Sequence, residues 1–581
     1  MNRLPAHRAS SPEGSLMKFI IVSGGVVSGL GKGTVSASLA LLLKSQGYKV
    51  TPVKIDMYLN VDAGTIRPQE HGEVFVTHDG VETDEDLGHY ERFLHENLVR
   101  ENYITTGQIY QEVIQKERAF MYEGEDVEAI PHVTDEIIRR IKLAGEVHKS
   151  DIVIVELGGT VGEYQNSIFF EATRIMKLKN PKDVIQLHVT YLPFLANIGE
   201  LKSKPAQTSV HILNGMGIHP DIIVARAEKE VDKRRLDRLA LFCNINPDCL
   251  FSAPDMHSIY EVPYYLSDSG KGIDDIALSL LGLRKKKHHL LNTWLKLIKT
   301  IQKKKLKTFK IAMVGKYFVT GNYKLSDSYV SVIEALKHAS WKIGANIDLD
   351  WIDREDIEKG TKNLKGFDGI IVPQGWGARG TEGKVLAAKF ARENNIPYLG
   401  LCFGMQMAVI EFARNVLGLN DANTQEANPK TKNPVIHIMP KQKEYLAKKQ
   451  YGGTIRLGAW PCLIKKGSKL EEAYLKYGKL LSAPWYKQNY LQPIHKSNSK
   501  KLLVFERHRH RYEFNNIFQQ RFKKKGLIVS GTSPDKKLVE AIELKNHPFF
   551  IGTQFHPEYI SRPLTPHPIF IKFLEVMKNL K

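Results

Sequence analysis

One cysteine of the chain lies in a sequence context that is typical of a nucleophile. Cys402 stands within Gly-Leu-Cys-Phe-Gly, between an apolar run and a pattern that predicts a helix. Small residues on both sides let the chain turn sharply and present the side chain at the edge of a sheet. The N-terminus of a helix also stabilises a thiolate. We therefore predict that Cys402 is a nucleophile, whereas Cys243, Cys249 and Cys462 lack this setting and are predicted to be buried structural residues.

A nucleophilic thiol needs a base, and one histidine further along the chain has a carboxylate close by. His556 follows the apolar run FFIGTQF, and Glu558 lies two residues later. This order fits a nucleophile, a base and a group that orients the base. The glycine-rich stretch 372–380 follows a predicted strand and offers backbone N–H groups for a developing oxyanion. His508 and His510 alternate with arginines and are predicted to lie on an anion-binding or salt-bridged surface.

A second group of residues, near the N-terminus, has the types that hold a phosphate. The loop GGVVSGLGKGT follows a short apolar run and precedes a predicted helix. Its glycines let backbone N–H groups and the helix N-terminus approach a phosphate, and Lys32 supplies a positive charge. The loop departs from the strict P-loop pattern, because Val26 occupies the first glycine position and Gly33 follows the lysine. By itself it leaves a plain strand-to-helix turn as an equal alternative.

Two acidic residues favour the phosphate interpretation. Glu156 ends the apolar run DIVIVE, and the carboxyl ends of parallel strands are where the magnesium of a nucleotide is held. Asp86 lies in the acidic cluster of DGVETDEDLGHYERF. A lone acidic cluster is usually a solvated face, but together with Lys32 and Glu156 the cluster predicts a second magnesium ligand at Asp86.

These residues need elements that bring them together, and the hydropathy pattern predicts two α/β units. KFIIVSG, SASLALLLKSQG and KVTPVKID have the patterns of a strand, a helix and a strand, which begin a parallel sheet. A second unit begins at KIAMVGKY. We predict two doubly wound parallel-sheet domains over 17–283 and 310–581, joined by a linker helix within 284–309 and preceded by a disordered tail at 1–16. Residues 465–501 are predicted to be an insertion without an assigned function.

Composition restricts the class of protein. The 581 residues are 42% hydrophobic and 25% charged, which excludes a wholly disordered or collagen-like chain. No apolar run reaches the roughly 18 residues of a membrane span, and the four cysteines include no CxxC pair. We therefore predict a cytoplasmic protein with no membrane partner. The net charge is +20, but much of the excess lies in short lysine runs, so no nucleic-acid partner is predicted and RNA binding is a weak alternative.

Longer motifs carry a family resemblance. GGVVSGLGKG, KIDMYLNVDAGTIRPQEHGEVFV, DGVETDEDLGHYERF and ELGGTVGE together closely resemble the synthetase domain of the CTP synthase family, which belongs to the dethiobiotin-synthetase-like P-loop folds. Cys402, His556 and Glu558, in this order, resemble a class I glutamine amidotransferase. The resemblance implies ATP-dependent amination of UTP to CTP with ammonia from glutamine hydrolysis. ATP would phosphorylate the 4-oxygen of UTP, and ammonia from an internal passage would displace that phosphate.

The resemblance also implies roles for individual residues. The ATP site would comprise Gly29, Leu30, Gly31, Lys32, Gly33, Thr34, Asp86 and Met256, with Mg²⁺ on Asp86 and Glu156 and with Lys32 and Lys54 supporting phosphoryl transfer. UTP, and CTP as feedback inhibitor, would bind at Ser28, Glu163, Tyr164, Gln165, Lys202, Ser203, Lys204, Pro205, Ala206, Gln207 and Arg238. Glutamine would bind at Gly375, Phe403, Gly404, Met405, Gln406, Glu426 and Arg511. The family further implies a homotetramer and GTP as allosteric activator.

Three stretches depart from the family pattern. Gln374, Trp376 and Ala378 stand where the family often has glycine, phenylalanine and tyrosine, a difference that bears on GTP activation. Arg238 replaces a common lysine, and arginine and lysine are not interchangeable at a phosphate. Residues 163–165 replace an Asp-Ile-Glu pattern, which points to weakened CTP feedback.

Two alternatives of other classes stay open from the residues. A non-catalytic nucleotide-binding scaffold of the same fold would need none of the reactive side chains. A partner-recruiting ATPase of the partition type also uses a degenerate P-loop, but it would leave the second half of the chain unexplained.

Overall fold

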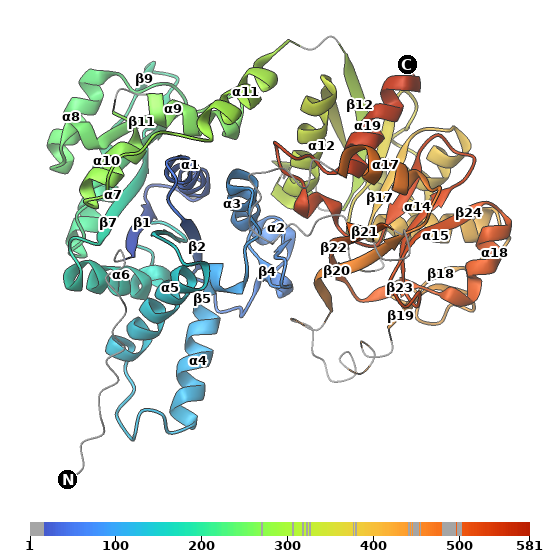
Figure 1. Ribbon diagram of the computed structural model, residues 1–581, viewed down its shortest axis with the longest axis horizontal. Coiled ribbons are helices and arrows are strands. Elements are labelled where there is room, and N and C mark those ends of the chain that lie inside the picture. The colour runs from blue at the N-terminus through green and yellow to red at the C-terminus, as the bar shows by residue number, and fades with distance from the viewer. Residues whose placement is uncertain are drawn as a thin grey trace. The chain divides into compact units, whose positions relative to one another are not determined.

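The computed structural model describes most of the chain, which divides into two compact units (Figure 1). The described residues are 17–268, 271–304, 307–316, 319–320, 323–324, 327–375, 377, 380–439, 442, 444, 453, 455–478, 495–496 and 502–580. Unit 1 holds the described residues up to Leu59 together with Ile104–Asn292, and unit 2 holds Asn60–Tyr103 together with the described residues from Thr293 onward. The predicted tail at 1–16 and residues 479–494 of the predicted insertion lie outside the described residues.

Unit 1 is built on a sheet of seven strands among the described residues, in the order β11-β10-β7-β1-β6-β2-β5. From β11 to β2 each neighbouring pair is parallel, as the βαβ pattern of the sequence predicts. The strands are β1 (Lys18–Gly24), β2 (Val50–Asp56), β5 (Tyr103–Thr105), β6 (Ile152–Leu157), β7 (Val184–Tyr191), β10 (Ile222–Ala227) and β11 (Leu250–Pro254). A short hairpin joins β8 (Phe194–Leu195) and β9 (Glu200–Leu201).

Helices connect these strands and supply the core around them. Phe19 and Ile21 of β1 pack in one cluster with Ile137 and Ile141 of α5. The helices are α1 (Lys32–Ser45), α4 (Thr106–Arg118), α5 (Thr134–His148), α6 (Ser167–Lys179), α7 (Lys204–Gly215), α8 (Lys233–Cys243), α9 (Val262–Asp268) and α10 (Ile273–Leu280). No helix of the described part of the chain combines the length and the apolar character that crossing a membrane requires.

Unit 2 is built on a ten-stranded sheet among the described residues, in the order β15-β12-β16-β17-β26-β25-β24-β20-β22-β21. The strands are β12 (Thr308–Gly315), β15 (Asn346–Asp353), β16 (Gly369–Val372), β17 (Tyr398–Leu401), β20 (Arg456–Ile464), β21 (His495–Lys496), β22 (Leu502–His510), β24 (Leu527–Thr532), β25 (Val539–Leu544) and β26 (Phe550–Thr553). The sheet is parallel from β15 to β26 and antiparallel from β26 to β21. The predicted parallel sheet is thus present from β15 to β26, and antiparallel strands extend it, because short turns rather than helical crossovers join β24, β25 and β26.

The remaining elements of unit 2 surround this sheet. Its helices are α11 (Leu291–Gln302), α12 (Val330–Ile343), α13 (Arg354–Glu358), α14 (Thr381–Glu393), α15 (Phe403–Asn415), α17 (Lys469–Tyr477), α18 (Gln519–Lys524) and α19 (Pro568–Leu580). Small sheets join β13 (Val319–Thr320) to β14 (Tyr323–Lys324), and β18 (Asn423–Thr424) and β19 (Pro434–Ile438) to β23 (Tyr512–Phe514). The helix α11 occupies the middle of the predicted linker. The helix α17 lies within the predicted insertion and buries Leu470 and Tyr474 in the core.

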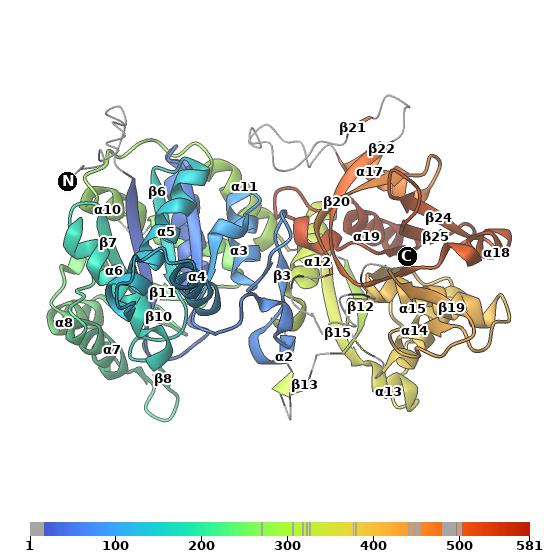
Figure 2. The same cartoon turned by 90° about the horizontal axis from the view of Figure 1, so that it is seen from below.

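Residues 60–103, which we call the docked segment, group with unit 2 although the sequence analysis assigns them to the N-terminal domain. The segment contains α2 (Pro68–His71), β3 (Phe75–Val76), β4 (Glu82–Thr83) and α3 (Asp86–Leu94). Its elements lie beside α12 and β22 of unit 2 (Figures 1 and 2). The physical reason is a set of buried ion pairs, among them Arg507 with Glu91, both of which are fully buried.

Candidate active sites

Cys402 occupies a sharp turn between β17 and α15. Its φ is +52°, in the left-handed region that non-glycine residues rarely adopt. Gly400 and Gly404 make the turn possible, because a Cβ on Gly404 would collide with the carbonyl oxygen of Val372. The backbone N–H of Cys402 donates to the carbonyl of Thr553 at 2.6 Å, which ties the turn to β26. The geometry presents the thiol at the carboxyl end of the parallel strands.

Two groups, one directly after β26 and one on β22, contact the thiol. The side-chain amide of Gln554 donates to Sγ of Cys402 at 3.5 Å, and Sγ lies 3.8 Å from the carbonyl oxygen of Arg509. Neither Gln554 nor Arg509 was predicted as a site residue, because each contacts the thiol only after β22 and β26 have been placed in the sheet. The three other cysteines are buried and free. Burial raises the pKa of each of their thiols, to about 11 for Cys243.

His556 and Glu558 form a buried pair beside the same cavity. Nδ1 of His556 lies 2.8 Å from Oε1 of Glu558, and Tyr559 stacks on the imidazole with ring centroids 4.9 Å apart. Burial alone would lower the pKa of His556, but the charges of Glu558 and Cys402 raise it to about 10. The imidazolium form is therefore favoured at neutral pH. Because Nδ1 is taken by Glu558, Nε2 is the nitrogen left to exchange a proton at the reacting centre.

The cavity brings together most of the predicted glutamine-binding residues. Cys402 and His556 line the cavity. Five predicted glutamine-binding residues also line it: Gly375, Phe403, Gln406, Glu426 and Arg511. Four lining residues were not predicted to bind glutamine: Gln374, Arg509, His510 and Tyr512. The predicted residues Gly404 and Met405 are buried in α15 and do not line it.

Two side chains, Lys384 and Glu426, form hydrogen bonds to the turn after β16. Nζ of the buried Lys384 donates to the carbonyls of Pro373 at 2.8 Å and Gln374 at 3.3 Å. Burial lowers the pKa of Lys384 well below its usual value. The backbone N–H of Gly377 donates to Glu426 at 2.6 Å. Of the predicted oxyanion stretch, residues 376, 378 and 379 lie outside the described residues.

The prediction for His508 and His510 is wrong. Both are buried on β22, which lies between β20 and β21 in the sheet, and their rings approach with Nδ1 of His508 2.9 Å from Nε2 of His510. Burial, followed by the charge of Arg456, lowers the pKa of each well below its usual value. The two rings are therefore buried and neutral, and they do not form a charged surface, although His510 also lines the Cys402 cavity.

In unit 1 the glycine loop follows β1 and leads into α1. Gly29 and Gly31 have φ values of +69° and +86°, which a residue with a side chain rarely adopts. Nζ of Lys32 donates to the carbonyl of Gly159 at 2.6 Å. Arg226, which was not predicted, donates to the carbonyl of Leu30 at 3.3 Å. The predicted ATP residues Gly33 and Thr34 form the first turn of α1, and Met256 follows β11.

Glu156 stands on β6 beside the loop-bearing strand and is paired in register with Val22 of β1 and Lys54 of β2. Nζ of Lys54 lies 3.2 Å from Oε1 of Glu156 and 3.8 Å from Oδ1 of Asp56. The strand ends thus hold a lysine and two carboxylates together in a buried cluster.

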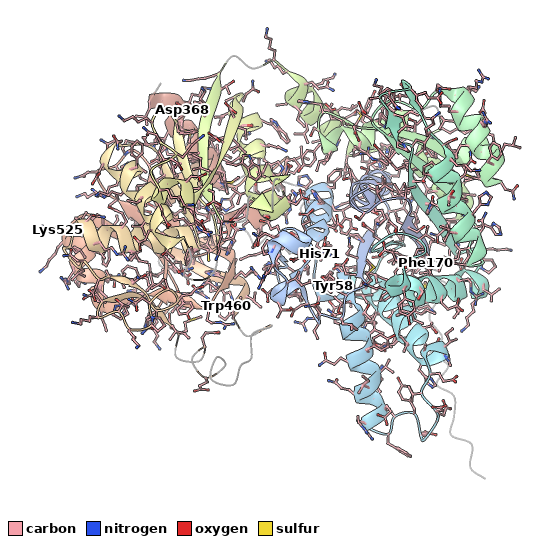
Figure 3. All side chains as sticks on the ribbon, turned by 180° about the vertical axis from the view of Figure 1, so that it is seen from behind. Tyr58, His71, Phe170, Asp368, Trp460 and Lys525 are labelled. Atoms are coloured by element: carbon pink, nitrogen blue, oxygen red, sulfur yellow. The ribbon has the colours of Figure 1, made fainter. Side chains whose placement is uncertain are left out.

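The second predicted metal ligand, Asp86, is the first residue of α3 and belongs to unit 2. Its backbone N–H donates to Oδ1 of Asp84 at 2.8 Å. In the same unit Nδ1 of His71, a residue labelled in Figure 3, lies 3.0 Å from Oδ2 of Asp84. Because Glu156 belongs to unit 1, its pairing with Asp86 on one metal ion stays a prediction.

Several of the predicted UTP and CTP residues are exposed on unit 1. Exposed positions include Ser28, Tyr164, Gln165, Lys204 and Arg238, and 94% of the surface of Tyr164 is accessible. Others make local contacts: Oε1 of Glu163 accepts from the N–H of Thr160 at 2.6 Å, Gln207 donates to Ser203 at 3.2 Å, and Lys202 pairs with Glu200. Pro205 and Ala206 lie in the first turn of α7. These contacts leave the nucleotide role of the set as a prediction.

Comparison with known proteins decides the family. Residues 18–283 match the family described as CTP synthase N-terminus, and residues 324–576 match glutamine amidotransferase class-I. The CTP synthase of Caldanaerobacter subterraneus is 46% identical over 97% of this chain and 99% of its own, and that of Sulfolobus acidocaldarius is 48% identical with the same coverage. The chain belongs to the CTP synthase family. A solved glutaminase domain of Trypanosoma brucei CTPS with bound acivicin matches 47% of this chain and 94% of its own, at 34% identity and a TM-score of 0.39.

Membership of the CTP synthase family identifies the chain as an enzyme that converts UTP to CTP in a glutamine-dependent reaction, with ATP as a substrate. It does not favour the alternative of a non-catalytic scaffold. Both CTP synthase halves are present, since the two family matches cover the P-loop sheet of unit 1 and the Cys402 cavity of unit 2.

Proposed function

We propose that the Cys402 cavity of unit 2 hydrolyses glutamine and that the loop at Lys32 in unit 1 binds the ATP that activates UTP. The observation that carries the first half is the arrangement of a thiol in a strained turn and a carboxylate-paired imidazole around one cavity. This arrangement matches the requirements for nucleophile, base and orienting group. Glu426 and Arg511 would hold the amino and carboxylate groups of glutamine, because they place opposite charges on the cavity wall.

Glutamine hydrolysis then proceeds in two acyl-transfer steps. The thiolate of Cys402 attacks the side-chain carbonyl of glutamine, and the imidazolium of His556 gives its proton to the departing nitrogen, so that a thioester forms and ammonia leaves. His556 next removes a proton from water, which attacks the thioester and releases glutamate with the thiol restored. Glu558 keeps the imidazole in the tautomer that both steps use. The backbone at Gly375 would stabilise the oxyanion of each tetrahedral intermediate.

The ATP-dependent half would use the glycine loop and the buried cluster of Lys54 and Glu156. Lys32 and Lys54 would neutralise charge on the transferred phosphoryl group. Carboxylate oxygens suit Mg²⁺, so Glu156 and Asp86 would hold it, and the ion would add charge neutralisation on the phosphates. UTP would be phosphorylated on its 4-oxygen, which turns a poor leaving group into phosphate. Ammonia reaching it through an internal passage would then displace that phosphate and give CTP.

Regulation and assembly complete the proposal. The exposed positions among the predicted UTP and CTP residues support a site completed by another subunit of a homotetramer, with CTP as feedback inhibitor. GTP would activate glutamine hydrolysis. The four free cysteines support a cytoplasmic location, where thiols stay reduced.

Replacing Cys402 by alanine tests the division of labour. The C402A variant should lose glutamine-dependent CTP formation by more than about 10³-fold, because the nucleophile is removed. CTP formation from added ammonium chloride should stay within twofold of the parent enzyme, since unit 1 keeps its loop and its lysines. Loss of both activities in a variant that remains folded would contradict two separate sites.

A further inference from the structure

The docked segment, which precedes the amidotransferase match by more than 200 residues, contacts the strand that faces the catalytic thiol. Oε1 of Glu82 accepts a hydrogen bond from Nε of Arg509 at 2.7 Å, and only 2% of the Glu82 side chain and 9% of the Arg509 side chain are exposed. Arg509 lines the glutamine cavity, and its carbonyl oxygen is the one that lies 3.8 Å from Sγ of Cys402. A glutamate of the N-terminal family region therefore fixes a wall of the glutaminase cavity.

A second acidic residue of the docked segment fixes the same strand two residues earlier. Nη2 of Arg507 donates to both carboxylate oxygens of Glu91, at 3.0 and 2.9 Å, and to Asn97 at 3.0 Å. The carbonyl of Arg507 accepts from the backbone N–H of His556 at 2.7 Å. Glu91 also pairs with Arg562. The backbone of the catalytic histidine is thus attached to a strand whose side chain is held by Glu91.

Two further contacts reach the imidazole and the turn after β16. The hydroxyl of Tyr559, whose ring stacks on His556, donates to the carbonyl of Val74 at 3.0 Å. Glu73 accepts from the side-chain amide of Gln374 at 3.2 Å and from the backbone N–H of Ser331 at 2.8 Å. The docked segment therefore contacts Arg509 of the cavity wall, the tyrosine that stacks on the base, and Gln374 in the turn after β16.

We propose that Glu82 is a positioning residue for glutamine hydrolysis, acting through Arg509 on the thiol of Cys402 and on the bound glutamine. The charge of Glu82 matters because the side chain of Arg509 is buried, and removing its carboxylate partner would leave an uncompensated buried charge on the strand whose carbonyl approaches the thiol. The same residue has no role in the ATP-dependent half, although it lies within the region that matches the synthetase family. The proposal rests on the role proposed above for Cys402.

The test measures both reactions of the full-length enzyme after the substitution E82Q, which preserves shape and removes the charge. Glutaminase kcat should fall at least tenfold, with a smaller change in KM, whereas ammonia-dependent CTP formation should stay within twofold. The substitution E101Q is the matched control, because Glu101 lies in the same segment and forms no ion pair with a described residue; both of its activities should match the parent. Loss of activity in C402A but not in E82Q would leave the glutaminase assignment intact and overturn the role of Glu82.

A second pair of variants covers the case in which E82Q folds poorly. In the variants R509M and E82Q/R509M no unpaired guanidinium is left in the core, and the two should have equal glutaminase activity if Glu82 acts only through Arg509. A further loss of tenfold in the double variant would overturn the proposal. Equal losses of the glutaminase and ammonia-dependent rates in E82Q would also overturn the proposal, because a purely structural role of Glu82 predicts that result. An unchanged rate of both reactions would overturn it as well, because it would mean that Glu82 has no role.

Discussion

Replacing Glu558 by glutamine removes the charge that keeps His556 protonated while preserving the size of the side chain. The pKa of His556 is raised from 6.5 to about 10 by Glu558 and Cys402 against the opposing effect of burial. A rise of this size corresponds to about 5 kcal/mol in favour of the imidazolium. Each pKa unit that is lost with the charge of Glu558 disfavours the imidazolium tenfold, so a loss of one to two units corresponds to roughly 10- to 100-fold. The E558Q variant should therefore stabilise the thiolate–imidazolium pair less than the parent does.

The tautomer of His556 adds to this loss. In the parent enzyme the carboxylate accepts the proton on Nδ1 at 2.8 Å and directs Nε2 to the reacting centre. A glutamine amide also donates, and a neutral imidazole that accepts on Nδ1 carries its proton on Nε2, the wrong atom for a base. In a serine protease the analogous change costs about 10⁴-fold in kcat. Glutaminase kcat should fall between roughly 10-fold and 10⁴-fold in E558Q.

The assay follows glutamate release at neutral pH and, in parallel, CTP formation from ammonium chloride, which should be unchanged. A fall of less than threefold in the glutaminase rate would refute the role of Glu558.

The pH dependence of the stability of the folded protein gives an independent check. The raised pKa means that His556 stabilises the folded state fully below pH 6.5 and that this stabilisation is lost as the pH rises from 6.5 to about 10. The urea midpoint of the parent should fall over that window more steeply than the midpoint of E558Q.

The turn at Cys402, the His556–Glu558 pair and the glycine loop at Lys32 were predictable as local structure because their signals are local. A cysteine between small residues at a strand end, and a histidine two residues before a glutamate, keep their neighbours whatever the rest of the fold does. The same holds for Lys32, whose loop is fixed by glycines at φ values of +69° and +86°. Parallel topology then places such strand ends at one edge of a sheet. The resemblance to a family supplied the identity of the ligands, which these local patterns do not contain.

The buried ion pairs that hold the strand beside Cys402 were not predictable, because the two residues of each pair lie far apart in the sequence. Glu91 and Arg507 are 416 residues apart, and nothing near either residue marks the other. The attraction between them holds residues 60–103 in unit 2. Sequence motifs show only the order of residues along the chain, so they place the same residues in the N-terminal domain. His508 and His510 show the same limit, since an alternating pattern of charged residues is typical of a surface strand but here belongs to a strand in the interior of a mixed sheet. Ionic residues in such a strand need buried partners, which the docked segment supplies.

Two further substitutions separate the halves of the enzyme and test the strained turn. K32A should lower ammonia-dependent CTP formation by at least 10²-fold, because the charge on the phosphate loop is removed, while glutaminase activity without nucleotides stays within twofold; an equal loss of both would contradict its placement at the phosphate. G404A should abolish glutaminase activity and lower the yield of folded protein, because the new Cβ would collide with the carbonyl oxygen of Val372 beneath the nucleophile. G215A is its control, since a Cβ there meets nothing within 4 Å and no positive φ is imposed, so its thermal midpoint should match the parent or exceed it slightly. Glutaminase activity equal to that of the parent in G404A would mean that the turn tolerates a wider separation between α15 and β16. The close approach of Gly404 to Val372 would then not be required to present the thiol of Cys402.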